Sequence, residues 1–198
     1  MSTAKKTRPA KRPPPAHPGA ARQDERIHEM LRVDHAGEYG AVRIYAGQRA
    51  VFRSLSQKGE LNESLARMEA EEREHLDRFN TILNERHVRP TALSPFWHVA
   101  GYALGAATAL MGEKAAHACT VAVEEVIDDH YAGQIRELEK LGEKEKPLTD
   151  TIAKFREEEI AHRDEALSKG AKEMPGYPLL SGAIKAACRF AIRASEKV

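Results

Sequence analysis

The sequence predicts an all-α protein with one folded domain. Aromatic residues make up only 6% of the 198 residues. The long stretches lack the glycine and asparagine punctuation, and the alternation of valine, isoleucine and threonine, that strands need. A chain of this length can build one core but is too short for two comfortable domains. We expect the folded domain to cover residues 24–198.

Residues 1–23 are expected to form a disordered, basic, proline-rich tail. They contain six Lys or Arg residues, five prolines and no acidic residue, so they can bury too little apolar surface to fold. The prolines also argue against the amphipathic helix of a mitochondrial presequence. A bacterial tail is the favoured interpretation.

Helical periodicity begins after this tail. Apolar residues recur at intervals of three and four, and glycine or proline separates the periodic stretches, as at Gly59, Pro90 and Pro175. The predicted helices cover about residues 24–55, about 61–85, a stretch that ends near 141, about 149–170, and the segment after Pro178.

An internal repeat places similar residues in both halves of the chain. The tetrapeptide Tyr-Ala-Gly-Gln occurs at 45–48 and at 131–134. Each copy lies seven residues, or two helical turns, after a lone glutamate, Glu38 or Glu124. Each half then carries the motif Glu-Glu-x-x-His, and the interval from the lone glutamate to this motif is nearly the same in both halves.

Six residues of the repeat are expected to bind two iron ions in a ferritin-like four-helix bundle. Glutamate oxygens are hard, anionic donors, and neutral imidazole suits iron and leaves coordination positions open for oxygen. A glutamate and a histidine three residues apart share one helix face, and lone glutamates complete the cage from two other helices. A solvated helix face would explain one Glu-x-x-His, but two matched copies favour a metal site. The predicted ligands are Glu38, Glu72, His75, Glu124, Glu159 and His162.

Acidic neighbours of these ligands leave an ambiguity that the repeat resolves in part. Glu38 has no glutamate neighbour and stands seven residues before its tetrapeptide, so its equivalent is Glu124. The three-residue spacing to histidine selects Glu72 and Glu159. The acids set aside are Glu71, Glu125 and Glu158.

Residues next to the ligands are candidates for supporting roles. His130 and Tyr131 follow Glu124 on the same predicted helix and are the candidate near-site catalytic residues, as relays of protons or electrons. Asp34 and Asp128 lie about one turn from a lone glutamate and are candidates for orienting the ligand histidines. For each of these residues an ordinary place in the bundle or on its surface remains the alternative. The same two interpretations apply to His35 and Tyr45.

Two segments, about 93–112 and about 179–198, are predicted to associate with a membrane. Residues 90–112 contain no Asp, Glu, Lys or Arg, which is typical of a transmembrane helix. A single crossing would separate the two halves of the metal site, so this segment must lie in the interface, re-enter, or form a long apolar crossover in the bundle. The last helix is amphipathic, with basic residues every four positions from Lys185 to Lys197. An ordinary amphipathic helix packed on the bundle is the alternative.

Charge and cysteine content exclude some classes. The net charge of +1 provides no electrostatic case for nucleic acid as a partner. Two cysteines, Cys119 and Cys188, without a secretory signal predict no disulfide framework and fit a reducing compartment. Both are expected in the core.

Four stretches of the chain resemble the demethoxyubiquinone hydroxylase family of ubiquinone biosynthesis. The resemblance runs from about Ile27 to the C-terminus and implies the same six ligands. Ferritins, rubrerythrins and ribonucleotide reductase small subunits share the Glu and Glu-x-x-His pattern but not these flanking strings. The stretches are RVDHAGEYGAVRIYAGQ, EEREHLDRFN, ACTVAVEEVIDDHYAGQI and FREEEIAHRD.

The resemblance implies a di-iron monooxygenase that hydroxylates the ring of a demethoxy polyprenyl benzoquinol. It implies two iron ions, O2 as co-substrate and an external two-electron reductant, for which NADH is one candidate; this chain has no glycine-rich nucleotide-binding motif. Expected partners are the quinol, a membrane surface and other proteins of quinone biosynthesis. The expected location is peripheral, on the cytoplasmic face of a bacterial inner membrane, with the matrix side of the mitochondrial inner membrane as the alternative. The competing functions are a ferritin-like iron-binding or ferroxidase protein without an organic substrate, and a purely structural membrane-surface protein.

Overall fold

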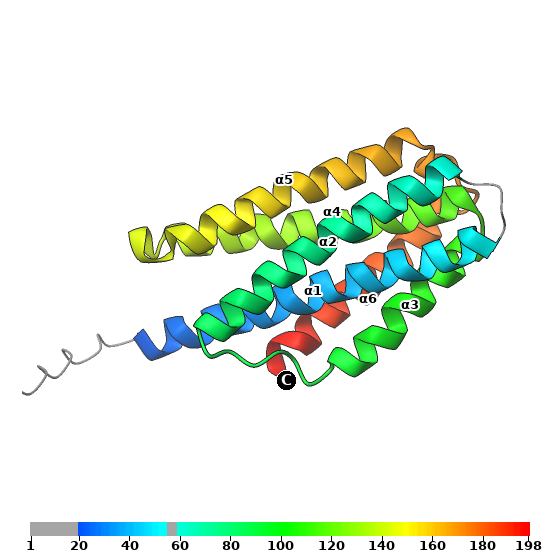
Figure 1. Ribbon diagram of the computed structural model, residues 1–198. Coiled ribbons are helices and arrows are strands. Elements are labelled where there is room, and N and C mark those ends of the chain that lie inside the picture. Colours follow the sequence, from blue (N-terminus) through cyan, green and yellow to red (C-terminus); the bar gives the residue numbers. More distant parts are fainter. Residues whose placement is uncertain (1–19, 55–58) are drawn as a thin grey trace, which may run out of the picture.

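The computed structural model describes residues 20–54 and 59–198, and the described residues contain helices but no strands (Figure 1). Two short 3-10 helices, Gly142–Glu145 and Ala171–Glu173, precede the last two α-helices. The all-α prediction is therefore confirmed. The α-helices are α1 (Ala20–Ser54), α2 (Gly59–Glu85), α3 (Ser94–Leu110), α4 (Glu113–Glu139), α5 (Lys146–Ser168) and α6 (Tyr177–Lys197).

Two antiparallel helix pairs form a four-helix bundle. The pairs are α1 with α2 and α4 with α5. Figure 1 shows α1, α3 and α5 running in one direction and α2, α4 and α6 in the other. Since α2 and α4 run the same way, α3 returns the chain between them, which makes α3 the crossover of the bundle. The extra helices cover its outside, α3 mainly against α1, and α6 against α4 and α1.

Several helices start earlier than the sequence predicted. Helix α1 begins at Ala20 rather than near residue 24, because alanine, arginine and glutamine all favour helix and the last proline of the tail is Pro18. The remainder of the predicted tail, residues 1–19, lies outside the described residues. Helices α5 and α6 begin at Lys146 and Tyr177, because a proline in the first turn of a helix lacks only an N–H that would be unpaired there.

Glycines allow α3 to touch α1 backbone to backbone. A Cβ atom added to Gly105 would lie 2.0 Å from the carbonyl oxygen of Ile44, and one added to Gly47 would lie 2.2 Å from that of Tyr102. Only glycine fits at such an approach. These two glycines therefore fix the position of the crossover helix against α1.

The two predicted membrane-associated segments do not span. Among residues 20–54 and 59–198, no helix combines the length and hydropathy that a membrane crossing needs. Ile184 of α6 is buried and Leu180 packs against the same cluster, so part of the apolar side of α6 lies on the bundle, while Leu179 and Phe190 remain exposed. Lys185 forms an ion pair with Glu125 of α4, so the predicted basic stripe is partly used within the protein.

Cys119 lies in the core as expected, whereas Cys188 lies at its edge. Cys119 is buried, Cys188 is half-buried, and both are free thiols in one apolar cluster between α4 and α6. Burial raises the pKa of the Cys119 thiol to about 12 and that of Cys188 to about 11, so both are protonated and unreactive at neutral pH.

Candidate metal centre

The six predicted ligands meet at the centre of the bundle. Each of the four bundle helices contributes at least one of them, and none of the six is more than 4% exposed. Glu-x-x-His places both side chains of α2, and both of α5, on the inward face of their helix. The contributions are Glu38 from α1, Glu72 and His75 from α2, Glu124 from α4, and Glu159 and His162 from α5.

The ligands form two overlapping groups of potential metal donors. In each group, one donor atom per residue lies within 4.8 Å of all the others. Glu72 and Glu159 belong to both groups and would therefore be shared between the two positions if both were occupied. The groups are Glu38, Glu72, His75 and Glu159, and Glu72, Glu124, Glu159 and His162.

Both histidines direct Nδ1 at the carboxylates. Nδ1 of His75 lies 3.0 Å from Oε1 of Glu159 and 3.3 Å from Oε2 of Glu38. Nδ1 of His162 lies 3.1 Å from Oε1 of Glu72 and 3.2 Å from Oε2 of Glu159. The donor atoms of both halves therefore face a common centre.

Burial controls the protonation of the four glutamates. It raises the pKa of Glu38, Glu72 and Glu124 above the ordinary value of a carboxyl group, and repulsion from Glu159 adds to the effect. Burial would also raise the pKa of Glu159, but hydrogen bonds from His162 and His75 outweigh it and lower that pKa to about 2. Without a cation, burial and mutual repulsion therefore favour the protonated form of three of the four carboxyl groups.

The histidines respond to the same cluster in the opposite sense. Burial disfavours their charged form, but hydrogen bonds to Glu159 and Glu38 raise the pKa of His75 to about 11, and the bond to Glu159 raises that of His162 to about 9. Protons held by buried donors fit a site built for cations, which displace protons when they bind.

Each tyrosine of the repeated tetrapeptide contacts the lone glutamate of the other half. Tyr131 donates a hydrogen bond to Glu38, and Tyr45 donates one of 3.4 Å to Glu124. Burial raises the pKa of both phenols. Tyr131, a candidate near-site residue from the sequence, thus touches a candidate ligand directly.

The repeat is not symmetric beyond the tyrosines. His130 lies with Nε2 3.2 Å from Oδ1 of Asp34, and the side chain of Gln134 donates to the same oxygen at 2.7 Å. The repeat equivalents of Asp34 and His130 are Thr120 and Ile44, which cannot form such a network. The network of Asp34, His130 and Gln134 therefore has no counterpart in the other half, where Thr120 instead contacts the Tyr45 hydroxyl.

The expected orienting role of the two aspartates is wrong. Asp34 bonds to His130 and Gln134 rather than to a ligand histidine. Asp128 accepts hydrogen bonds from Arg156 at 2.6 Å and Arg163 at 3.3 Å. Both aspartates thus bond to side chains other than the ligand imidazoles, since a position one turn from a ligand does not specify which neighbouring helix the side chain meets.

The Nε2 atoms of the two ligand histidines contact glutamates that the sequence analysis did not choose as ligands. Oε2 of Glu158 lies 2.8 Å from Nε2 of His75, and Oε2 of Glu71 lies 2.7 Å from Nε2 of His162. The available signal was the doubled glutamate, which occurs in both halves of the repeat.

An apolar cavity of about 280 Å³ lies between α1, α3, α4 and α6. Its walls are mostly aliphatic, and its polar lining includes Asp34, His130 and Tyr131. Since Tyr131 also bonds to Glu38, one side chain separates the cavity from the predicted metal ligands. The aliphatic lining includes Val33, Ile44, Leu104, Val123, Ile127 and Ile192.

Comparison with known proteins identifies the family. The model of the family described as ubiquinone biosynthesis protein COQ7 matches residues 25–195. The chain belongs to the COQ7 family. It is 53% identical over 173 residues to the 3-demethoxyubiquinol 3-hydroxylase of Rhodospirillum rubrum, covering 87% of this chain and 78% of that protein.

More distant COQ7 relatives carry similar names. The Bos taurus protein named NADPH-dependent 3-demethoxyubiquinone 3-hydroxylase, mitochondrial, is 49% identical over 175 residues, with 88% of this chain and 79% of the relative covered. The Saccharomyces cerevisiae protein named 5-demethoxyubiquinone hydroxylase, mitochondrial, is 38% identical over 184 residues, with 87% and 78% covered. The resemblance drawn from the four sequence stretches is confirmed.

This COQ7-family chain exposes apolar side chains on the two helices outside the bundle. On α3 and the turn after it, Phe96, Val99, Leu110 and Met111 are each more than half exposed. Leu179, at the start of α6, is 82% exposed. Because α3 and α6 also line the cavity, the apolar surface and the cavity lie on the same side of the bundle.

Proposed function

We propose that this chain is a di-iron monooxygenase that hydroxylates the ring of a demethoxy polyprenyl benzoquinol in ubiquinone biosynthesis. The observation that carries the proposal is the juxtaposition of a buried Glu and His cluster with an apolar cavity across Tyr131. The names of its COQ7-family relatives support a hydroxylase role. A cluster alone would suit a ferritin-like iron protein, whereas an aromatic lipid substrate also needs an apolar cavity beside it.

The donor set fits two iron ions. Glu38 and His75 would bind one ion, Glu124 and His162 the other, and Glu72 and Glu159 would be shared. Carboxylate oxygens with a few imidazoles suit Fe(II) and carry enough negative charge to balance two divalent ions. When bound, the iron pair supplies the binding and reduction of O2, for which two electrons come from an external reductant.

The residues around the cavity would hold the quinol ring against the metal centre. The aliphatic side chains of the cavity exclude water, and the Tyr131 hydroxyl donates a hydrogen bond to Glu38. Nε2 of His130 lies between Asp34 and Gln134. Nδ1 is therefore the ring nitrogen that would accept a proton from a ring hydroxyl, and the Asp34 carboxylate would stabilise the resulting imidazolium. The network of Asp34, His130 and Gln134 lies on the Glu38 side of the metal centre, and we propose that the quinol binds on this side.

A membrane surface is the proposed source of the substrate. A polyprenyl tail buries many methylenes at about 0.8 kcal/mol each and does not leave lipid for a water-facing pocket. Exposed apolar residues on α3 and α6, such as Leu110 and Leu179, would place the mouth of the cavity against lipid, and Arg189 and Arg193 are exposed on α6 to meet anionic head groups. We propose a peripheral protein on the cytoplasmic face of a bacterial inner membrane.

The proposed reductant is a nicotinamide nucleotide acting from outside the chain. The Bos taurus relative is named NADPH-dependent, and NADH would deliver the same two electrons. Other quinone-biosynthesis proteins are proposed partners for lifting the lipid substrate toward the cavity.

The decisive experiment follows oxygen into the quinol. Iron-reconstituted protein is mixed with liposomes that contain a demethoxy polyprenyl quinol, a nicotinamide reductant and 18O2, and the lipids are analysed by mass spectrometry. We expect a product that contains one 18O atom, and none with Glu124→Ala protein. Iron oxidation without a labelled quinol would favour the ferritin-like alternative and refute the proposed function.

A further inference from the structure

The doubled glutamate of each repeat gives two adjacent acids different directions. Glu72 and Glu159 point into the centre and are 1% exposed. Glu71 and Glu158 lie one residue earlier, where a helix turns the side chain by about 100°, and their side chains are 40% exposed. The outer acids therefore sit at the rim of the metal centre, between the ligands and solvent.

Each outer acid reaches the histidine of the opposite half. Glu71 of α2 bonds to Nε2 of His162 on α5 at 2.7 Å, and Glu158 of α5 bonds to Nε2 of His75 on α2 at 2.8 Å. The two bonds cross the same interhelical gap in opposite directions. Chance contact of a surface carboxylate would not produce this reciprocity in both copies of the motif.

A cation one turn earlier holds each outer acid in place. Arg67 forms an ion pair with Glu71 at 3.2 Å, and Lys154 forms one with Glu158 at 3.3 Å. Each cation occupies position i−4 relative to its acid on the same helix. The duplicated unit is therefore a chain of cation, carboxylate and imidazole that ends at the metal centre.

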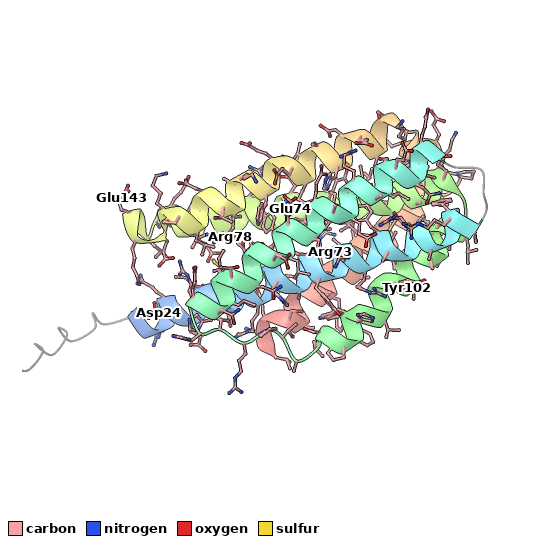
Figure 2. All side chains as sticks on the ribbon, in the orientation of Figure 1. Asp24, Arg73, Glu74, Arg78, Tyr102 and Glu143 are labelled. Atoms are coloured by element: carbon pink, nitrogen blue, oxygen red, sulfur yellow. The ribbon has the colours of Figure 1, made fainter. Side chains whose placement is uncertain are left out.

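The units line a small groove that opens between α2 and α5. Its volume is about 160 Å³, and its floor includes His75 and His162. Glu74 lines the same groove and is exposed on α2 (Figure 2), but its carboxylate contacts neither imidazole. Glu74 therefore adds negative charge to the groove but makes no hydrogen bond to a ligand imidazole.

We propose that Glu71 and Glu158 are positioning residues of the metal centre, each fixing the ligand histidine of the other half. By accepting the Nε2–H, each carboxylate keeps the tautomer whose Nδ1 lone pair faces the centre, holds the ring plane, and makes the nitrogen a better donor. The two bonds also tie α2 to α5 through the ligands. This inference rests on the metal centre of the proposed function but not on its substrate.

Binding of Co2+ alone to the metal-free protein tests this role. Affinity is measured by competition with a chelator for wild type, Glu71→Ala, Glu158→Ala and the corresponding Gln variants. We expect each Ala variant to bind Co2+ about 10- to 100-fold more weakly. The Gln variants should recover part of the loss, since an amide oxygen still accepts from Nε2–H. Glu74→Ala, the matched control, should bind within about twofold of wild type.

The proton NMR spectrum of the Co2+ protein reports on each ring separately. Two exchangeable, paramagnetically shifted Nε2–H signals are expected in wild type. In Glu158→Ala, the His75 signal should disappear or exchange faster with solvent, and the His162 signal should stay unchanged. In Glu71→Ala, the His162 signal should be affected and the His75 signal should stay unchanged. His75→Gln and His162→Gln assign the two signals. A merely structural acid would not select one imidazole on the opposite helix.

The outcomes separate this proposal from the proposed function. Wild-type protein that binds no Co2+ would overturn the metal centre, and with it this inference. Normal Co2+ binding by wild type and both Ala variants would overturn the positioning role alone. An equal loss in Glu74→Ala would assign the effect to groove charge and also overturn it.

Discussion

Replacement of Gly105 by alanine tests whether the backbone contact between α1 and α3 shapes the cavity. The added Cβ would lie 2.0 Å from the carbonyl oxygen of Ile44, while ordinary contact begins at about 3.4 Å. A backbone oxygen cannot rotate away as a flexible side chain can, so the two helices must separate by more than about 1 Å. Gly101 and Leu104 of α3 line the cavity, so this shift also widens it.

The expected energy follows from two opposing effects. Forcing atoms into a packed contact costs about 1–3 kcal/mol, and a backbone clash belongs at the upper end. Alanine in place of glycine within a helix returns about 0.5–1 kcal/mol. Gly105→Ala should therefore destabilise the protein by about 2 kcal/mol.

Gly133→Ala is the matched control. Gly133 lies within α4, and a Cβ there meets only the end of the Arg136 side chain at 3.9 Å. This variant should gain about 0.5–1 kcal/mol from helix propensity alone. The two variants then differ by about 3 kcal/mol, which corresponds to about 6–12 °C in Tm for a protein of this size.

Urea and thermal unfolding, followed by far-UV circular dichroism in one metal state, measure the difference. The hydroxylation rate on the same preparations reports on the cavity, and Gly105→Ala should lower it while Gly133→Ala leaves it near wild type. Equal stability of the two variants would show that α3 does not rest on the backbone of α1.

Three further predictions concern the site and the surface. Tyr131→Phe should lower the hydroxylation rate at least about tenfold and leave the iron content unchanged, because it removes the hydrogen bond to Glu38 at the cavity. Tyr45→Phe should have a smaller effect, since Tyr45 does not line the cavity. The apparent Co2+ affinity, measured by competition with a chelator, should rise by about tenfold or more per pH unit between pH 6 and pH 8. The metal must displace protons from the groups whose pKa is raised, and higher pH removes these protons; the groups are Glu38, Glu72, Glu124, His75 and His162. An affinity that does not change with pH would contradict this prediction. The side chain of Leu110 is 74% exposed, and Leu110→Asp should reduce flotation of the protein with liposomes severalfold. Asn84→Asp, the control, adds the same charge on α2 and should not reduce flotation. Unchanged flotation of Leu110→Asp would argue against the apolar face of α3 as the lipid contact.

The sequence was a good guide where the signal is local. Helical periodicity and the Glu-x-x-His spacing both depend on residues within one or two turns, so the all-α fold and the inward pairs Glu72–His75 and Glu159–His162 were predictable. Helix starts were less predictable. Helices α5 and α6 begin before the predicted positions, at Lys146 and Tyr177, because each accommodates a proline in its first turn. Leu104 and Leu110 looked equivalent in the apolar run, yet Leu104 packs inward and Leu110 faces out.

Duplication let the sequence by itself determine the six candidate ligands, because two copies of one local pattern identify the residues that matter without any knowledge of their neighbours. Only the tertiary structure decided which residues meet across helices. It pairs Tyr131 with Glu38 and Glu71 with His162, and it sends Asp34 to His130 instead of a ligand. Such contacts depend on how helices far apart in sequence are rotated and spaced, and packing of whole faces sets these quantities.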